Sequence, residues 1–427
     1  MIIETELTLM EDSSRLSEYW ETGIYRFENS KVVFMDPVRV LNRSYTRFRV
    51  SPSGYYTRFF DSKPETKLSS TSKKRKRKQE KPYSLNERER AADQRHQQVK
   101  PMLLKALECL AVDTDLLATM RDLRTDFCSL KELLPVSDND EPCFVDLGRV
   151  WQAPLYEITL NFPYPRKDSV VFCCLGSSLD QCRDQRIIPV FNNLVVNETC
   201  EDVEAELLNM KYLLPRQSCF YMSDLGQIRN LIPAESDYGF NLIVIDPPWE
   251  NASASQKLLY PTLPNRYFLS LPIKQLTHTN GALVGLWVTN REKLRIFVEK
   301  ELFPAWGVNY AASFYWLKVK ADGSLVSDID LFHHKPYECL LLGYCHQEGT
   351  NVRPNSSLRT VEQDKVIISI PGDYSRKPPI GELLLEHVPG PKPARCLELF
   401  AREMMGGWTS WGNEPVHFQN LRYFKER

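Results

Sequence analysis

The feature that most constrains the fold is the stretch over residues 241–250, which reads Asn-Leu-Ile-Val-Ile-Asp-Pro-Pro-Trp-Glu. Residues 242–245 are apolar and mostly β-branched, and two prolines follow directly after Asp246. This pattern predicts a short, buried parallel strand that ends at Ile245. Open α/β sheets bind their ligands outside the carboxyl ends of the strands, so the sequence brings a carboxylate, two rigid prolines and an indole to that edge.

The tetrapeptide Asp246-Pro247-Pro248-Trp249 suggests a specific chemistry. Proline fixes its own φ and holds the preceding residue extended, so the Asp246 carboxylate and the Pro247 carbonyl are acceptors with fixed directions. The exocyclic amine of a nucleobase offers two N–H donors that suit this pair, and Trp249 would then stack on a base turned out of its strand. A proline-rich turn after a strand is the alternative interpretation of these four residues alone.

The chain after about residue 206 alternates apolar strands with helical stretches, which favours a doubly wound α/β sheet. Helices are expected over residues 292–302 and 380–387. No Gly-x-Gly-x-x-Gly motif is present, so a dinucleotide site of the usual kind is not predicted. Seven candidate strands cover residues 219–222, 242–245, 282–288, 313–319, 337–344, 366–370 and 395–400.

Asp246 to Trp249 resembles the catalytic Asp-Pro-Pro-Trp signature of the adenine-N6 methyltransferases typified by the messenger-RNA adenosine methyltransferase. Within that family the chain most resembles the methyltransferase-like protein 4 group, from about residue 219 to residue 418. The signature precedes Leu399-Phe400-Ala401-Arg402, which is similar to the family's Leu-Phe-Gly-Arg segment. The resemblance implies a Rossmann-like class I methyltransferase domain with the permuted, β-class motif order and a seven-stranded, mostly parallel sheet. It also implies that Asp246, Pro247, Pro248 and Trp249 are the catalytic residues.

The same resemblance implies S-adenosyl-L-methionine as the cofactor. Gly412-Asn413-Glu414 resembles the family's Gly-Asn-Gln, whose side chains bind the cofactor ribose. Glu414 departs from that pattern, although a carboxylate can still accept from both ribose hydroxyls. Lys335 is expected to neutralise the methionine carboxylate. The implied cofactor-binding residues are Ser223, Asp224, Leu225, Asp246, Lys335, Phe400, Arg402, Asn413 and Glu414.

On the substrate side, a long connection over residues 251–266 follows the tetrapeptide. Its Tyr260-Pro261-Thr262 resembles the family's Tyr-Gly-Thr substrate loop, so Tyr260 is the expected second wall of the base pocket. Lys377 is expected to contact a nucleic-acid phosphate. For Lys335 and Lys377 taken singly, a solvated surface lysine is the alternative. The implied substrate-binding residues are Tyr260, Lys257, Arg266, Asn290 and Lys377.

The formal charge of −1 conceals a strongly basic segment. Residues 61–100 contain 13 Lys and Arg against 6 Asp and Glu, and Lys73 to Lys78 form an unbroken basic run. Such a run without apolar periodicity is typical of a disordered segment that serves as a nuclear import signal or as a phosphate-binding arm. A merely solubilising linker is the third interpretation. We therefore expect the import machinery as a partner and the nucleus as the location.

The length of 427 residues and the 42% apolar content predict several domains. In the first of them, residues 38–50 alternate like a strand and residues 51–55 resemble a hairpin turn. Arginines alternate with aromatic residues there, which suits either an ordinary half-buried strand or a sheet that faces nucleic acid. The expected divisions are a strand-rich N-terminal element over 1–60, a basic disordered linker over 61–98, a middle domain over 99–205 that opens with a helical hairpin, and the methyltransferase domain over 206–427.

Other classes of protein fit the sequence less well. No apolar run approaches the length of a membrane span, so no membrane association is expected. The 11 cysteines include no Cys-x-x-Cys pair, which argues against a metal site and favours reduced thiols.

The sequence thus predicts an S-adenosylmethionine-dependent N6-adenine methyltransferase that acts on nucleic acid. RNA is favoured, with N6 methylation of 2′-O-methyladenosine in small nuclear RNA implied by the group resembled. An N6-adenine DNA methyltransferase is an alternative, because only a contact to the 2′-oxygen separates the two substrates. A non-catalytic RNA-binding scaffold subunit is an alternative of another class. The chain is expected to act as a monomer, since it brings its own N-terminal and middle domains.

Overall fold

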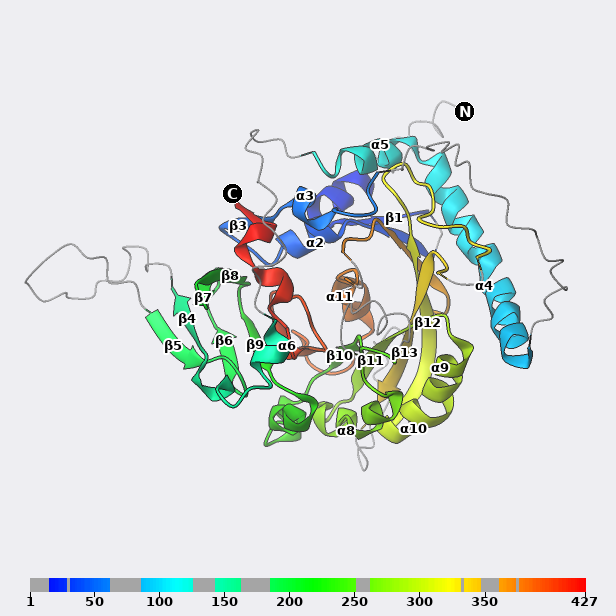
Figure 1. Cartoon of the computed structure of the whole chain (residues 1–427). Helices are drawn as coiled ribbons and strands as arrows, with labels where there is room; N and C mark the ends of the chain where they lie inside the picture. Colours follow the sequence, from blue (N-terminus) through cyan, green and yellow to red (C-terminus); the bar gives the residue numbers. More distant parts are fainter. Residues whose placement is uncertain are drawn as a thin grey trace, which may run out of the picture.

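A computed structural model describes residues 15–28, 31–61, 86–125, 143–162, 185–250, 262–331, 334–346, 361–373 and 376–427 of the chain (Figure 1). Its main feature is an 11-stranded, mostly parallel sheet. In spatial order its strands are β1 (Ile24–Arg26), β2 (Val32–Met35), β14 (Lys365–Ser369), β12 (Val308–Lys318), β13 (Tyr337–Cys345), β11 (Ala282–Val288), β10 (Leu242–Ile245), β15 (Cys396–Leu399), β16 (Trp408–Gly412), β9 (Ser218–Met222) and β6 (Leu194–Asn197).

The centre of the sheet fixes where the tetrapeptide emerges. β10 is buried along its whole length and pairs in parallel with β11 and β15. Ile245 lies opposite Leu286 on one side and Leu399 on the other. The residues that follow β10 and β15 therefore leave the sheet at the same edge.

The α/β class and the mostly parallel sheet are confirmed. All seven predicted strands are present, within a few residues of their expected bounds. Four further strands join the same sheet, namely β1, β2, β6 and β16. β2 agrees with the strand-like pattern expected around Val32, Val33 and Phe34. β1, β6 and β16 are short and lack a strict apolar alternation, so the sequence pattern did not separate them from loops and core segments.

Alternate residues of the central strands pack on opposite faces of the sheet, as the two-residue period of a strand requires. Ile243 and Ile245 pack with the helices of one face and Val244 with those of the other. The first face is covered by α8 (Ile273–Leu276), α9 (Glu292–Phe297), the π-helix η6 (Val298–Leu302), α10 (Phe303–Trp306) and the 3-10 helix η5 (Asn265–Ser270). The second is covered by α11 (Gly381–Leu384) and the 3-10 helix η7 (Leu385–His387).

The N-terminal segment differs from its prediction in detail. The strand expected over residues 38–50 is largely the helix α2 (Pro37–Asn42), and only β3 (Phe48–Val50) is a strand. Asp36 caps α2 by accepting hydrogen bonds from the backbone N–H groups of Val38 and Arg39, and Pro37 suits the first turn. Local capping therefore overrides the alternating pattern.

The hairpin turn expected over residues 51–55 is the short helix α3 (Pro52–Tyr55), with Ser51 as its N-cap. β3 pairs with β17 (Phe424–Glu426) from the other end of the sequence. β2 pairs in parallel with β14 and so extends the main sheet. The described residues before 61 are thus built into the same body as β14 and β17.

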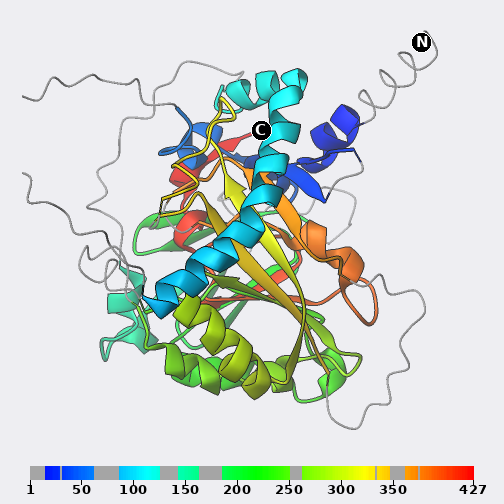
Figure 2. The same cartoon turned by 90° about the vertical axis from the view of Figure 1, so that its right-hand side faces the viewer.

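The long helix α4 (Glu87–Val112) begins inside the segment that was expected to be linker up to residue 98. Asn86 and Glu89 form a reciprocal capping box at its start, a signal that outweighs the surrounding charge. α5 (Thr114–Asp122) follows and completes the predicted helical hairpin. In Figure 2, α4 crosses the molecule in front of the main sheet and passes beside α9. The basic run Lys73 to Lys78 lies outside the described residues.

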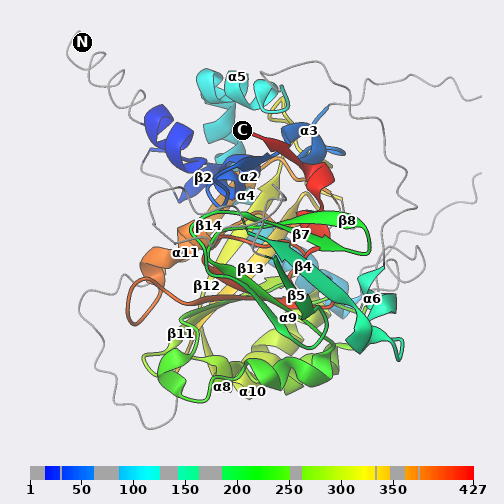
Figure 3. The same cartoon turned by 90° about the vertical axis from the view of Figure 1, so that its left-hand side faces the viewer.

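The middle of the chain forms a separate antiparallel sheet beside the main one (Figure 3). Its strands run in the order β5 (Gln185–Pro189), β4 (Glu157–Asn161), β7 (Val203–Leu207) and β8 (Met210–Leu214). β6 leaves this region and pairs with β9 of the main sheet. Short helical turns, α6 (Phe144–Leu147) and η2 (Ala153–Leu155), precede β4, and η3 (Leu225–Leu231), η4 (Ser236–Tyr238), η8 (His417–Gln419) and η9 (Leu421–Tyr423) lie between strands elsewhere.

Within the described ranges, none of the helices is long and apolar enough to cross a membrane. The same residues contain no group of three or more metal-ligating side chains.

Candidate active site

The tetrapeptide forms a tight, fully hydrogen-bonded turn at the end of β10. The Asp246 N–H donates to the Leu399 carbonyl of β15 at 3.2 Å, and the Trp249 N–H donates to the Pro247 carbonyl at 2.7 Å. The Pro248 carbonyl accepts from the Leu263 N–H at 3.0 Å. The Pro247 oxygen keeps a second lone pair for a substrate donor. The Asp246 side chain is 20% exposed and faces a cavity.

The indole of Trp249 is placed differently from expectation. Trp249 is only 7% exposed, its Nε1 donates to the Trp287 carbonyl at 2.8 Å, and its ring meets Phe268 edge-on at 5.1 Å. A buried indole usually finds a partner for its N–H, and here that partner is the backbone of β11. In this conformation Trp249 anchors the turn to the sheet and offers no open face for a base.

Asp246 ends a row of charges of alternating sign. The Lys377 Nζ lies 3.1 Å from Asp246 Oδ2 and 3.4 Å from Glu338 Oε2, and Lys318 pairs with the other side of Glu338. Burial pushes the pKa of Glu338 upward, but Lys318 and Lys377 outweigh it and hold the pKa at about 2. Burial lowers the pKa of Lys377, and the two carboxylates overcome this and raise it. Burial raises the pKa of Asp246, which Lys377 only partly opposes.

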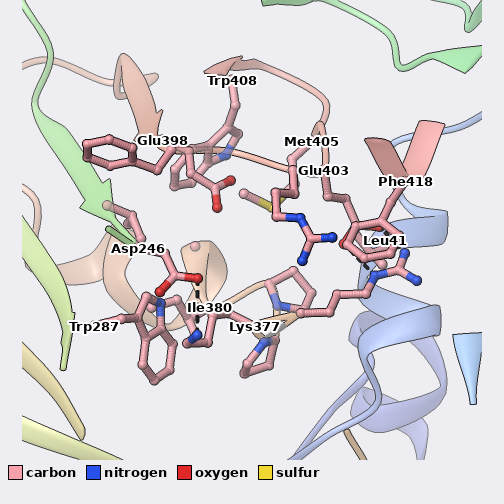
Figure 4. A pocket seen from close by; sticks show the side chains of 17 residues that line it. Leu41, Asp246, Trp287, Lys377, Ile380, Glu398, Glu403, Met405, Trp408 and Phe418 are labelled. Atoms are coloured by element: carbon pink, nitrogen blue, oxygen red, sulfur yellow. Dashed lines mark hydrogen bonds and ion pairs between the residues drawn. The ribbon is translucent and has the colours of Figure 1, made fainter. Parts of the chain in front are cut away.

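Asp246 and Lys377 open into a cavity at the carboxyl edge of β10 and β15 (Figure 4). Its wall carries both signs of charge and several apolar side chains. The lining residues are Leu41, Val244, Asp246, Trp287, Arg376, Lys377, Pro378, Pro379, Ile380, Gly381, Glu398, Phe400, Arg402, Glu403, Met405, Trp408 and Phe418.

Glu398 is a site residue that the sequence interpretation missed. It lies in β15 opposite Val244, and in Figure 4 its carboxyl points into the cavity. No described residue forms a hydrogen bond or ion pair with it. Burial, with further repulsion from Asp246 and Glu403, raises its pKa to about 8. An acidic residue inside an otherwise apolar strand was the available signal.

The end of β15 continues into Phe400 and Arg402, both expected at the cofactor. Phe400 has φ of 63°, a conformation that non-glycine residues rarely adopt, and its ring contacts Phe268 and Trp411. The Arg402 Nε lies 3.1 Å from Glu414 Oε1. Burial raises the pKa of Glu414 and Arg402 opposes this. Arg402 and Glu414, both expected at the cofactor, are thus brought together, and the exposed Asn413 precedes Glu414 in the chain.

The segment over residues 223–225 follows β9, at the same edge of the sheet. The Ser223 N–H donates to the Gly412 carbonyl at 3.0 Å, and the Ser223 hydroxyl accepts from the Trp411 indole at 2.9 Å. Asp224 caps η3 and is exposed, and Leu225 is half-buried. Ser223 therefore ties β9 to β16, and Asp224 and Leu225 stand next to Asn413 through that contact.

The two lysines lie at different places in the fold. Lys377 is buried against Asp246 in the cavity, where it forms ion pairs with Asp246 and Glu338. Lys335 lies in a second cavity, together with Asn290. The roles assigned to them, Lys335 at the methionine carboxylate and Lys377 at a phosphate, stay predictions. Both lysines stand in basic loop motifs, and the sequence does not say toward which face each loop turns.

Of the other expected substrate-binding residues, Arg266 lies among the described residues, whereas Lys257 and Tyr260 do not. Arg266 is exposed in η5, close in the chain to Asn265, whose side chain accepts from the Glu250 N–H at 3.1 Å. Lys257 and Tyr260 lie outside the described residues, so their assignment to the base pocket stays a prediction.

The N-terminal segment supplies part of the cavity wall, which sequence interpretation did not anticipate. Arg376, next to Lys377, is 3% exposed and lies between the rings of Tyr55 and Phe418, with its Cζ 4.1 Å from each centroid. Its Nε donates to Glu403 at 3.0 Å. Leu41 of α2 lines the cavity directly. Residues from the start of the chain thus hold the loop that carries Lys377.

The residues present fit S-adenosyl-L-methionine. Arg402 at the cavity wall would hold the carboxylate and ribose of the cofactor, Lys377 stays paired with Asp246 and Glu338, and Glu398 is a carboxyl group in the cavity without a cation of its own. That combination suits the amino-acid end of the cofactor, which carries one charge of each sign. Phe400 supplies an apolar wall between them.

Comparison with known proteins agrees with this geometry. Residues 240–414 match the family model described as MT-A70. The chain is 39% identical over 237 residues to N(6)-adenine-specific methyltransferase METTL4 of Mus musculus, which covers 55% of this chain and 49% of that protein. It is 32% identical to the N6-methyladenosine RNA methyltransferase MTA1 of Pyricularia oryzae over 52% of this chain and 59% of that protein.

A third relative is the DNA N6-methyl methyltransferase of Caenorhabditis elegans, 32% identical over 50% of this chain and 56% of that protein. The chain spans about half the length of the curated relatives it matches. The matched segment holds the tetrapeptide, Lys377, Glu398, Arg402 and Glu414. Over residues 240–414 the chain is thus similar to MT-A70 proteins.

Proposed function

We propose that the chain transfers a methyl group from S-adenosyl-L-methionine to N6 of an adenine in nucleic acid. The observation that carries this proposal is the position of Asp246. It follows the central strand of the segment that is similar to MT-A70 proteins and faces a cavity with the charges of an amino-acid zwitterion. The relatives named above support the same reaction class, since their names specify N6 methylation of adenine.

The cofactor, when bound, supplies an electrophilic methyl group on a sulfonium. The chain's own residues bind and orient the adenine amine. Asp246 and the second lone pair of the Pro247 carbonyl accept the two N–H bonds of the adenine amine and fix its direction. The hydrogen bond from Trp249 to the Trp287 carbonyl keeps both acceptors in place. Catalysis then rests on orientation and on preorganised charge.

Lys377 has the task of keeping Asp246 an acceptor. The Asp246 carboxylate is largely buried, and burial raises its pKa, so it gains a proton more easily than an exposed carboxylate does. The ammonium 3.1 Å away favours the charged form. The N6 proton becomes strongly acidic as the nitrogen takes the methyl group and positive charge, so Asp246 receives it without being a strong base.

RNA is the proposed substrate, in the form of 2′-O-methyladenosine in small nuclear RNA. This follows from the resemblance to the methyltransferase-like protein 4 group, and the RNA methyltransferase among the relatives supports it. The DNA methyltransferase among them supports DNA as the alternative. We further propose that the protein acts as a monomer in the nucleus, imported through Lys73 to Lys78.

A non-catalytic scaffold is the second candidate. The complete tetrapeptide and the pairing of Asp246 with Lys377 argue against it, because a scaffold has no need of a charged acceptor at a cofactor cavity.

The test is methyl transfer from labelled cofactor to matched oligonucleotides with one adenosine, made as RNA, 2′-O-methyl RNA or DNA. We expect label at N6 of one class, and none with Asp246→Ala, whose affinity for the cofactor measured by calorimetry stays within about threefold of wild type. Lys300→Ala, on the exposed surface of η6, is the matched control and should label normally. Cofactor binding without labelling of any substrate would favour the scaffold.

A further inference from the structure

A second cavity lies between α4, the carboxyl end of β11 and the amino end of β13. Its lining includes Arg95 and His96 of α4, Thr289 and Asn290 after β11, and Lys335 and Tyr337 before or in β13. We call it the α4 cavity. Figure 2 shows α4 in front of the sheet.

The α4 cavity adjoins the tetrapeptide. Arg291, in its wall, donates to the carbonyl oxygen of Glu250 at 3.2 Å, and Glu250 directly follows Trp249. Trp249 in turn donates to the carbonyl of Trp287, two residues before Thr289. The cavity and Asp246 thus lie at the same edge of the sheet, on either side of β11.

Two polar groups in the wall have bonding capacity that the described residues leave unused. Thr289 Oγ1 and His96 Nε2 are buried without a hydrogen-bond partner among them, and His96 is only 3% exposed. The nearest acid to His96 Nε2 is Asp330 at 3.8 Å, beyond hydrogen-bond distance. Buried polar atoms without partners are uncommon in folded proteins, so their convergence on one cavity points to a ligand.

Lys335 indicates which charge the ligand should carry. Arg95 is already held by Glu292 in two hydrogen bonds of 3.0 and 2.9 Å, and Arg295 pairs with Glu299. Lys335 forms no ion pair with any described carboxylate and is half-buried. Burial lowers the pKa of Lys335, with Asp93 and Asp330 opposing. An anionic or strongly accepting group in the cavity would restore the solvation that this ammonium has lost.

We propose that the α4 cavity holds the ribose-phosphate unit next to the target adenosine, with Lys335 on the phosphate and Thr289 on the sugar or phosphate oxygens. This inference rests on the proposed function and assigns the path of the strand. Ribose-phosphate chemistry is common to RNA and DNA, so both are tested. The strand enters beside α4, whose first residue follows the basic segment by a few positions.

The experiment measures binding of labelled single-stranded RNA and DNA by fluorescence anisotropy at several salt concentrations, with full-length protein. Lys335→Gln should weaken binding about tenfold and make the salt slope shallower by about 0.7, the value for one lost phosphate contact to a single strand. Lys211→Gln, an exposed lysine in β8, is the charge-matched control and should leave both unchanged. Cofactor affinity should be the same in all three proteins.

The Thr289→Val variant distinguishes two interpretations of the α4 cavity, a binding site and a gap in packing. Loss of the unpaired hydroxyl should leave folding intact and raise the midpoint of unfolding slightly. If the hydroxyl bonds the strand, oligonucleotide binding weakens about three- to tenfold, while methylation of free adenosine is unaffected.

Wild-type binding by both variants would overturn the proposal, as would a Lys335→Gln protein that loses cofactor affinity instead of oligonucleotide affinity. Lys335-dependent binding without any methyl transfer would contradict the proposed function alone. Methyl transfer with an unaffected Lys335→Gln protein would contradict the strand path alone.

Discussion

The Nζ of Lys377 lies 3.1 Å from a carboxylate oxygen of Asp246, across 131 residues of sequence. The cation stands beside the acceptor that is proposed to hold the adenine amine. The electrostatic state of the site therefore depends on a loop that follows β14, and not only on the tetrapeptide itself.

Replacing Lys377 with Met should move the acid limb of the pH profile. Burial already raises the pKa of Asp246, and the removal of Lys377, its largest opposing charge, raises that pKa further. Because the charged acceptor is the active form, kcat/KM at saturating cofactor should fall at higher pH values than in wild type. Lys300→Met, exposed on η6, is the control. An acid limb at the wild-type pH would show that Lys377 does not govern Asp246.

Glu338 should make stability depend on pH in the acid range. Its folded pKa of about 2 lies below the ordinary value of 4.5, so its stabilisation is fully present above pH 4.5 and is lost as the pH falls toward 2. The shift corresponds to about 3 kcal/mol, and partial solvent screening reduces this to about 2 kcal/mol. Urea unfolding of wild type and Glu338→Gln should therefore differ most near neutral pH and converge near the acid end. A difference that is constant with pH would contradict the ion-pair role.

Glu398 should change stability with pH in the direction opposite to Glu338. Its folded pKa of about 8 exceeds the ordinary 4.5, so the folded state is destabilised progressively as the pH rises from 4.5 to 8. Glu398→Gln removes that cost and should stabilise the protein by about 2 kcal/mol above pH 8 but not below pH 4.5.

The same variant should bind the cofactor about tenfold more weakly, because the amide cannot pair with its amino group. Thermal unfolding at the two pH values and calorimetry measure the two effects separately. Unchanged cofactor affinity would remove Glu398 from the site.

The packing of Arg376 between Tyr55 and Phe418 predicts that a residue of the N-terminal segment, Tyr55, affects cofactor binding. Tyr55→Leu removes one of the two rings that enclose the guanidinium, a contact worth about 0.5–2 kcal/mol, and should weaken cofactor binding several-fold. Tyr55→Phe keeps the ring and is the matched control. In a Lys377→Met background the Tyr55→Leu change should weaken cofactor binding little further, since both act on one loop. Fully additive effects in that double variant would mean that Tyr55 acts independently of Lys377.

The sequence predicts the strands at the core of the sheet well, because β10 and β11 are buried on both faces and read as unbroken apolar runs, and β15 departs from such a run only at Glu398. It fails where local chemistry competes with periodicity. Residues 38–50 alternate like a strand, yet Asp36 and Pro37 begin a helix there. Residues 87–98 are highly charged, yet the capping box at Asn86 begins α4.

The site is predictable where one segment carries it and not where several segments meet. Asp246, Phe400 and Arg402 follow predicted strands, so their common edge is deducible from the α/β pattern. Lys335 and Lys377 both stand on loops, and only the fold decides that Lys377 faces Asp246 while Lys335 faces α4. Leu41 and Tyr55 are more than 180 residues from Asp246 in the sequence, so no local pattern links them to the cavity.

The pairing of β3 with β17, together with the enclosure of Arg376 by Tyr55 and Phe418, constrains how the protein is made. During synthesis β3 and Tyr55 leave the ribosome long before their partners. β17 and Arg376 emerge only when residues 376–426 have been made. Closing so long a loop is slow, and the exposed edge of β2 has to be kept from other chains meanwhile. The cofactor cavity is therefore among the last parts to be completed, and a truncated product cannot carry it.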